Sequence, residues 1–240
     1  MMNRRQILAT AAAAVLIAPL AVQAQGFPNK PVKVIVPYVP GGGADILRGG
    51  SANDSLAGGD GLNVVRGGFG DDTIHGGAQF DDLHGNQGAD VMRGAGGDDW
   101  VVGGKGNDLL FGDEGSDIVY GNTGRDTVDG GAGNDWVRGG QGDDIVRGGP
   151  GDDWIAGDRG ADVLYGGDGA DTFYTFRDAG FDQVVDFKIA EGDRVQLLPG
   201  TIYTVSQRGA DTVILMEGVG RMALSDVQLS TLPEGWLFEA

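Results

Sequence analysis

Aspartates recur every nine residues over more than half of this chain of 240 residues. From residue 40 to residue 174 the chain divides into fifteen nine-residue blocks without insertion or deletion, and the sixth position is aspartate in fourteen of them. The exception is Asn63, whose side chain also offers an oxygen. Carboxylate and carbonyl oxygens are the ligands that a hard divalent cation such as calcium prefers in proteins. The spacing indicates repeated cation binding, provided that the fold brings the aspartates together.

The other fixed positions of the block describe the element that must hold them. Position eight is apolar in all fifteen blocks, from Leu47 to Phe173, whereas position one is glycine except at Pro40 and position four is glycine except at Ala52 and Gln79. A strand over positions seven to nine would point the apolar side chain to one face. Glycine allows the tight, left-handed turn that must follow. One apolar residue per block is buried only when copies stack, so the pattern predicts a solenoid.

The block resembles the nonapeptide G-G-x-G-x-D-x-U-x of the RTX family. The resemblance implies an all-β fold, a parallel β-roll (a right-handed β-solenoid of nonapeptide repeats) in which block n lies beside block n + 2. The aspartates would then stack about 4.8 Å apart, and bare carboxylates at that separation repel one another. Calcium between adjacent turns would reverse the sign, at no more than 13 sites. Magnesium demands stricter geometry and should substitute poorly.

The expected calcium ligands are the ladder aspartates and the glycines of positions two and four, whose turns expose their carbonyls. The aspartates are Asp54, Asp72, Asp81, Asp90, Asp99, Asp108, Asp117, Asp126, Asp135, Asp144, Asp153, Asp162 and Asp171. The glycines are Gly104, Gly106, Gly131, Gly133, Gly140, Gly142, Gly149 and Gly151. Turns without metal, or a disordered acidic linker, would not explain the apolar position eight.

The amino-terminal segment divides into two parts. Residues 1–24 have the anatomy of a signal peptide, with Arg4 and Arg5 before a short apolar run and a cleavage site after Ala24. The arginine pair also allows a twin-arginine route. Residues 25–39 are expected to form a strand or cap. The stretch from Phe27 to Leu47 resembles the opening of the solute receptors of tripartite tricarboxylate transporters, which implies a strand at residues 32–38, a loop at 40–45 and, as an alternative function, a truncated carboxylate receptor.

Residues 175–240 lose the nine-residue period and are expected to form a β-rich cap. Strands are predicted at residues 184–187, 194–197, 202–207, 211–216 and 221–229, with a hairpin turn around Gly218. The segments DTF at 171–173, VDF at 185–187 and GDRV at 192–195 resemble the carboxy-terminal cap of RTX proteins exported by type I secretion. The terminal WLFEA is compatible with the uncleaved export signal of that family.

Composition excludes several classes of function. The formal charge is −18, which argues against nucleic acid and anionic membranes as partners and favours a cation. Cysteine is absent, so neither disulfides nor thiolate sites hold the fold. No apolar segment beyond the signal peptide could span a membrane, so the protein is not expected to be an integral membrane protein. The only histidines, His75 and His84, should lie on opposite sheets, and no H-E-x-x-H motif occurs. We expect no enzymatic activity and a secreted, or alternatively periplasmic, location.

A stripe of large apolar residues is expected on the outside of one sheet. Position seven of alternate blocks carries Trp100, Ile118, Trp136 and Trp154. Three explanations are open: the cap folds back over the stripe, the rings pack across strands under solvent, or the stripe binds a glycan or a partner protein. The last of these would make the chain a carbohydrate-binding or adhesion module, like the repeat modules attached to alginate epimerases.

Overall fold

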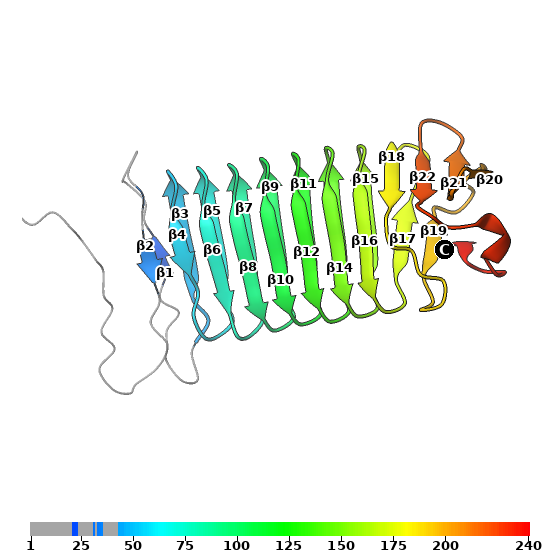
Figure 1. The fold of residues 1–240 in the computed structure, drawn as a ribbon. Helices are drawn as coiled ribbons and strands as arrows, with labels where there is room; N and C mark the ends of the chain where they lie inside the picture. Colours follow the sequence, from blue (N-terminus) through cyan, green and yellow to red (C-terminus); the bar gives the residue numbers. More distant parts are fainter. Residues whose placement is uncertain (1–20, 24–30, 32, 36–42) are drawn as a thin grey trace, which may run out of the picture.

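The structure is a computed structural model that describes residues 21–23, 31, 33–35 and 43–240. Within these residues the chain forms two facing sheets that run along the length of a roll, as Figure 1 shows. Sheet A contains β1 (Ala21–Gln23), β3 (Ile46–Ser51), β5 (Val64–Phe69), β7 (Asp82–Gln87), β9 (Trp100–Lys105), β11 (Ile118–Thr123), β13 (Trp136–Gln141), β15 (Trp154–Arg159), β17 (Thr172–Thr175), β19 (Arg194–Leu197) and β23 (Leu237–Glu239). Sheet B contains β2 (Lys33–Ile35), β4 (Ser55–Ala57), β6 (Thr73–Gly77), β8 (Val91–Gly96), β10 (Leu109–Glu114), β12 (Thr127–Ala132), β14 (Ile145–Pro150), β16 (Val163–Asp168), β18 (Phe181–Val184), β22 (Arg221–Leu224), β21 (Asp211–Met216) and β20 (Tyr203–Arg208).

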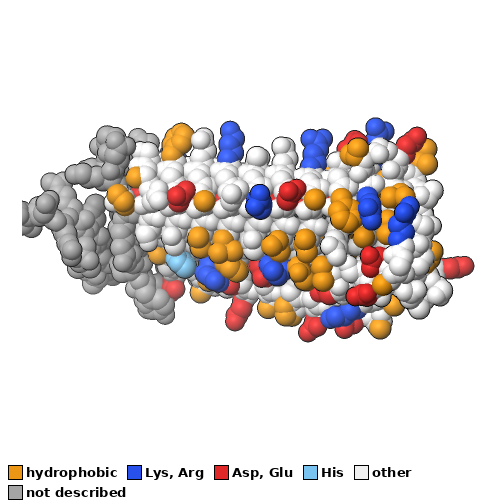
Figure 2. Space-filling model, turned by 45° about the horizontal axis from the view of Figure 1, so that its top comes forward, with side chains coloured by type: hydrophobic (Ala, Val, Ile, Leu, Met, Phe, Trp, Pro, Cys, Tyr) orange, Lys and Arg blue, Asp and Glu red, His pale blue; other side chains and the backbone are white. Residues whose placement is uncertain are grey.

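The register confirms the predicted β-roll. Successive strands alternate between the sheets, and each pairs in parallel with the strand two further along, so Leu110 of β10 lies beside Val128 of β12. One coil therefore takes two blocks. The fifteen position-eight side chains form the inner rows and are at most 1 % exposed. Figure 2 shows one outer face, where hydrophobic and charged side chains lie in groups along the roll.

The strands are longer than the sequence pattern predicted. β9 to β16 each have six residues and run from position seven through position three of the next block, so the first glycines of the block lie inside the strand. Position two is the residue with the left-handed backbone, also where it is not glycine: φ is 80° at Asn86, 76° at Asp113 and 78° at Asn122. Asn and Asp tolerate this conformation best after glycine, which explains their use there.

The cap continues both sheets beyond the repeats. β17, β19 and β23 extend sheet A, while β18 and β22 extend sheet B before the antiparallel strands β21 and β20. Leu197, Ile214 and Met222 complete the core at this end. The strands at 194–197 and 211–216 lie as predicted, and the hairpin turn at Gly218 connects β21 and β22. The strand expected at residues 184–187 instead occupies 181–184, and the one expected at 221–229 ends at Leu224.

The amino-terminal end is described only in part. β1 pairs with β3, and β2 pairs with β4, so both lie beside the first coil. Of the strand implied by the receptor resemblance, the structure describes residues 33–35. Most of the predicted signal peptide and the loop at residues 40–42 lie outside the described residues. Within the described part of the chain, no helix is long and apolar enough to cross a membrane.

Candidate calcium sites

The position-six aspartates form two buried ladders, one along each edge of the roll. Each is at most 3 % exposed from Asp54 to Asp171. One carboxylate oxygen, Oδ1, accepts the backbone N–H of the aspartate one coil earlier: Asp90 donates to Asp108 at 2.9 Å, and Asp108 donates to Asp126 at 2.8 Å. The 18-residue interval of these bonds is the coil repeat, so the backbone itself fixes the carboxylates inside the turns.

The second carboxylate oxygen, Oδ2, has no hydrogen-bond partner in twelve of these aspartates, although it is buried. A buried charge without a partner is strongly unfavourable, so each of these atoms requires an explanation. The twelve are Asp72, Asp81, Asp90, Asp99, Asp108, Asp117, Asp126, Asp135, Asp144, Asp153, Asp162 and Asp171.

The one block without an aspartate shows what surrounds this atom. The side-chain Nδ2 of Asn63 donates to the carbonyl oxygens of Gly59 and Gly61, at 3.3 and 3.2 Å, and to Oδ1 of Asp81 at 2.8 Å. Gly59 and Gly61 occupy positions two and four of the block. In every other block Oδ2 replaces this N–H donor, so carboxylate and carbonyl oxygens face one another with no hydrogen between them. A cation is the group that would satisfy them.

The position-one glycines leave room for this cluster of oxygens. A Cβ on Gly76 would lie 2.5 Å from Oδ2 of Asp81 and 2.6 Å from the carbonyl oxygen of Gly94 in the next coil. Both distances are shorter than any real Cβ contact, and the same clash recurs at Gly130 with Asp135. Buried carboxylate and carbonyl oxygens that converge in a space kept free of side chains fit calcium in type.

The eight glycines named as candidate ligands also lie along these edges. Their φ angles range from 108° to 143°. A Cβ on Gly106 would overlap the carbonyl oxygen of Gly88, and a Cβ on Gly104 would approach that of Asn86. The carbonyls of positions two and four therefore stack coil upon coil. Among the described residues, no N–H donates to the carbonyl oxygens of Gly88 and Gly106, which leaves both lone pairs available.

Adding one methyl group at position four should test this packing. Gly106→Ala is expected to destabilise the folded roll by several kcal/mol, because the new Cβ meets a backbone carbonyl and φ is 138°. Ala52→Gly is the matched control, since Ala52 occupies position four at φ 120° and its replacement should stabilise by about 1 kcal/mol. Urea unfolding in saturating calcium measures both. Equal effects of the two substitutions would contradict this account.

Burial shifts the acidity of the ladder. Burial raises the pKa of Asp99 to about 8 from an ordinary 3.8; the N–H of Asp81 opposes this, and the charge of Asp117 adds to it. Burial likewise raises the pKa of Asp108 and Asp144 to about 7. The fold therefore favours protonated carboxyls unless a positive charge balances them.

Two further ladder members were missed by the sequence pattern. Asp193 accepts the N–H of Asp171 at 3.0 Å through Oδ1 and that of Lys188 at 2.7 Å through Oδ2, so its ladder ends on hydrogen bonds. Asp182 is fully buried and accepts the Thr175 hydroxyl at 3.4 Å. Both stand directly before residues paired with position seven of the previous coil. Their offsets of 20 and 22 residues, instead of 18, hid them.

The second acid of each Asp-Asp pair has a different task. Oδ1 of Asp98 accepts the N–H of Ser116 at 2.9 Å, and Oδ1 of Asn107 accepts the N–H of Arg125 at 2.8 Å. Asp98 is exposed, whereas its neighbour Asp99 is buried. Position five thus stitches coils together without metal, and the two carboxylates of a pair diverge as expected.

The histidines take no part in the ladders. His75 lies on β6 of sheet B, and His84 lies on β7 of sheet A, where Nε2 is 2.9 Å from Asp82. Across the residues that the structure describes, no three His, Cys, Asp or Glu side chains gather as a metal site. This agrees with sites in which backbone carbonyls supply most of the ligands.

A parallel β-roll with two buried carboxylate ladders and stacked turn carbonyls is the architecture of a calcium-binding repeat protein. The profile of the RTX calcium-binding nonapeptide repeat matches residues 40–74, 66–101, 75–110, 93–128, 111–146, 120–155 and 147–175. These segments cover more than half of the chain, which belongs to this family.

Similarity to other known proteins is limited. Among solved structures, the extracellular lipase LipA from Serratia marcescens resembles the chain with 18 % sequence identity and a TM-score of 0.42, over 83 % of this chain. The chain spans 40 % of the length of that lipase. No curated protein matches the sequence.

Proposed function

We propose that the chain is a secreted calcium-binding protein whose roll folds when calcium binds between adjacent coils, and that it has no catalytic activity of its own. The observation that carries the proposal is the set of twelve buried Oδ2 atoms without partners. These atoms are unfavourable in the folded roll and harmless in the solvated, unfolded chain. Cation binding therefore adds its free energy to folding.

The residues proposed to hold calcium are the ladder aspartates and the glycine carbonyls of positions two and four. Consecutive aspartates of one ladder share each space between coils, so the number of ions is at most 13. Extracellular sites of this type work at about 10⁻⁴–10⁻³ M calcium. The chain would then remain unfolded in a calcium-poor cytosol and fold after export.

Asn63 should mark a place where no ion is needed, because its amide already bonds the surrounding oxygens. Asn63→Asp is expected to add at least one calcium ion to the stoichiometry and to lower stability at limiting calcium. Equilibrium dialysis with radioactive calcium, followed by urea unfolding at low and high calcium, measures both. Asn53→Asp is the control, since Asn53 lies at the exposed position five. An unchanged stoichiometry in Asn63→Asp would contradict the assignment.

The export route is proposed to follow one of two signals. Residues 1–24 would direct the chain to the periplasm or beyond, and the carboxy-terminal residues would direct type I secretion. In the folded roll the terminal residues form β23, which pairs with β19, and the carbonyl of Trp236 accepts the N–H of Val195 at 2.7 Å. A receptor that recognises this segment must therefore meet it before the cap folds. Secretion assays after deletion of residues 1–24 or 236–240 separate the two routes.

The alternative of a truncated carboxylate receptor is favoured less. The resemblance on which it rests ends at Leu47, and that residue is already the first inner side chain of the roll. Isothermal titration with calcium and then with succinate tests both functions. Calcium binding without succinate binding supports the proposal, and succinate binding alone would replace it.

A further inference from the structure

The outer face of sheet A carries an aromatic row that the cap leaves open. Trp100, Ile118 and Trp136 are 43, 38 and 47 % exposed. The cap adds β17, β19 and β23 to the end of sheet A instead of folding back over it. Coverage by the cap, one of the explanations that the sequence allowed, is therefore wrong for these residues.

The row is continued by a fixed arc of rings. The ring centroids of Trp136 and Trp154 are 4.7 Å apart, those of Trp154 and Tyr174 are 5.1 Å apart, and those of Tyr174 and Phe176 are 6.2 Å apart. The indole N–H of Trp154 donates to Gln196 at 3.1 Å, which holds this ring in place. Aromatic rings held in this way form a rigid apolar platform that loses little entropy on binding.

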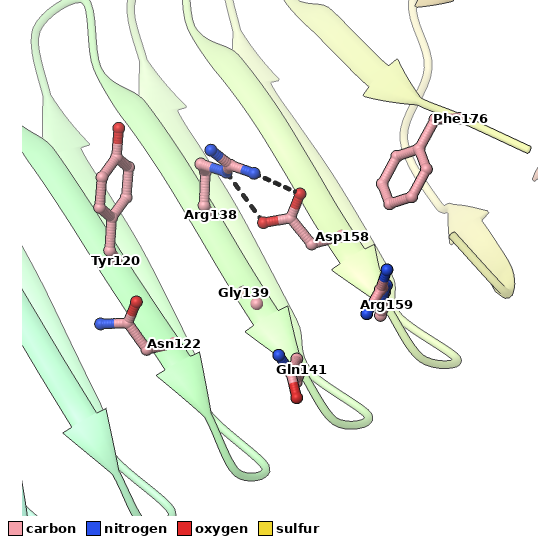
Figure 3. Close-up of a pocket in the computed structure, with 9 residues that line it drawn as sticks. Tyr120, Asn122, Arg138, Gly139, Gln141, Asp158, Arg159 and Phe176 are labelled. Carbon is pink, nitrogen blue, oxygen red and sulfur yellow. Dashed lines mark hydrogen bonds and ion pairs between the residues drawn. The ribbon is translucent and has the colours of Figure 1, made fainter. Parts of the chain in front are cut away.

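A groove of about 370 Å³ lies beside this platform. Figure 3 shows Tyr120 at one end, Phe176 at the other, and the ion pair of Arg138 and Asp158 between them. Arg138 donates to both oxygens of Asp158, at 2.8 and 2.6 Å, so the floor of the groove is pre-organised. The exposed side chain of Gln141 lies at the rim.

The polar groups of the groove can both donate and accept hydrogen bonds. The amides of Asn122 and Gln141 offer one acceptor and two donors each, Asp158 adds acceptors, and Arg159 adds donors. Within the described residues, neither Arg159 nor Gln141 has a side-chain partner in the fold. Flat aromatic walls together with planar amide, guanidinium and carboxylate groups match a ligand that has an apolar ring face and hydroxyl groups along its edge.

We propose that this groove and the adjoining tryptophans bind a saccharide of neutral pyranose rings. The inference rests on the proposed function, because the groove joins β11, β13 and β15 and exists only when the roll is folded. Its volume is in the range of small-molecule sites, about 300–1,000 Å³. A neutral sugar also avoids repulsion by a chain whose formal charge is −18.

A protein partner or a second copy fits the same surface less well. Stable protein interfaces bury at least about 1,000 Å² around a broad apolar centre. Here the exposed apolar row is one side chain wide, and Arg138 and Asn122 flank it on the same face. A narrow strip edged by planar polar groups suits an extended chain of sugar rings better than a flat protein surface.

Binding of cellohexaose, chitohexaose and maltohexaose to the calcium-loaded full chain tests the proposal. At least one is expected to bind and to change tryptophan fluorescence. Trp136→Ala and Tyr120→Ala should each weaken that binding about five- to tenfold, whereas Trp136→Phe should weaken it less. Ile145→Ala is the matched control, because Ile145 is 37 % exposed at the same position of sheet B and should leave binding unchanged.

Two readouts keep this test separate from calcium-driven folding. Each variant is first shown to gain the wild-type β spectrum with calcium, so that loss of binding cannot reflect loss of the roll. Failure of the wild type to bind any of the three sugars while fully folded would overturn the proposal and leave the calcium function intact. A calcium-loaded dimer that Trp136→Ala converts to monomer would overturn it in favour of self-association.

Discussion

Chelation of calcium at neutral pH is expected to unfold the roll and abolish most of its β-sheet signal. At that pH the twelve Oδ2 atoms would carry buried negative charge with neither a hydrogen bond nor a cation beside them. One apolar side chain per block contributes only about 1.5–3 kcal/mol, and backbone ordering opposes it at every residue. Far-UV circular dichroism with excess chelator, then with excess calcium, measures the change.

Magnesium provides the control for this result. It prefers octahedral geometry at shorter distances and keeps its water, so equal concentrations of magnesium should restore little of the signal. Asp108→Asn should shift the calcium midpoint to higher concentration, because the ladder loses one charged oxygen in the middle of the roll. A native β spectrum that persists in excess chelator would show that the ladders need no cation.

Acidification is expected to stabilise the calcium-free roll. Burial raises the pKa of eleven ladder aspartates to between about 6 and about 8, from an ordinary 3.8. Between these values the folded chain binds more protons than the unfolded chain. The free energy of unfolding therefore falls as pH rises from about 4 to about 8, and the added stability is present only on the acid side of this window.

Urea unfolding of the calcium-stripped chain at pH 5, 6, 7 and 8 measures this slope. Replacing one titrating group by Asp144→Asn should make the slope shallower, whereas Asp143→Asn, at the exposed neighbouring position, should leave it nearly unchanged. With calcium present the trend should reverse, since protons then compete with the cation for the same oxygens. Stability that rises with pH in the calcium-free chain would contradict the burial of these carboxyls.

The roll could be predicted because its register is written in the spacing of the residues. An uninterrupted interval of nine places the same position of every block in the same row, so Val101, Val119 and Val137 had to stack once the strands were assigned. The ladder aspartates followed from the same arithmetic. The burial of their carboxylates followed from hydrogen bonds to the backbone one coil earlier, which spacing alone does not reveal.

The parts that escaped prediction depend on changes of interval or on contacts between rows. Asp182 and Asp193 continue the ladders after short insertions, so no fixed period leads to them. The ion pair of Arg138 and Asp158 joins positions nine and two of adjacent coils, an offset of 20 residues that a nine-residue pattern does not display. The end of β18 at Val184 depends on how Gly180 stacks on Gly160, which is a tertiary contact.

Locating the ions in the folded protein tests the central claim most directly. Crystals grown in calcium chloride and measured at a long X-ray wavelength would show calcium as anomalous difference peaks. The account predicts two rows of peaks, one along each edge of the roll, beside the Oδ2 atoms of successive ladder aspartates, with no peak at Nδ2 of Asn63. An ordered roll whose ladder carboxylates have no peaks beside them would contradict it.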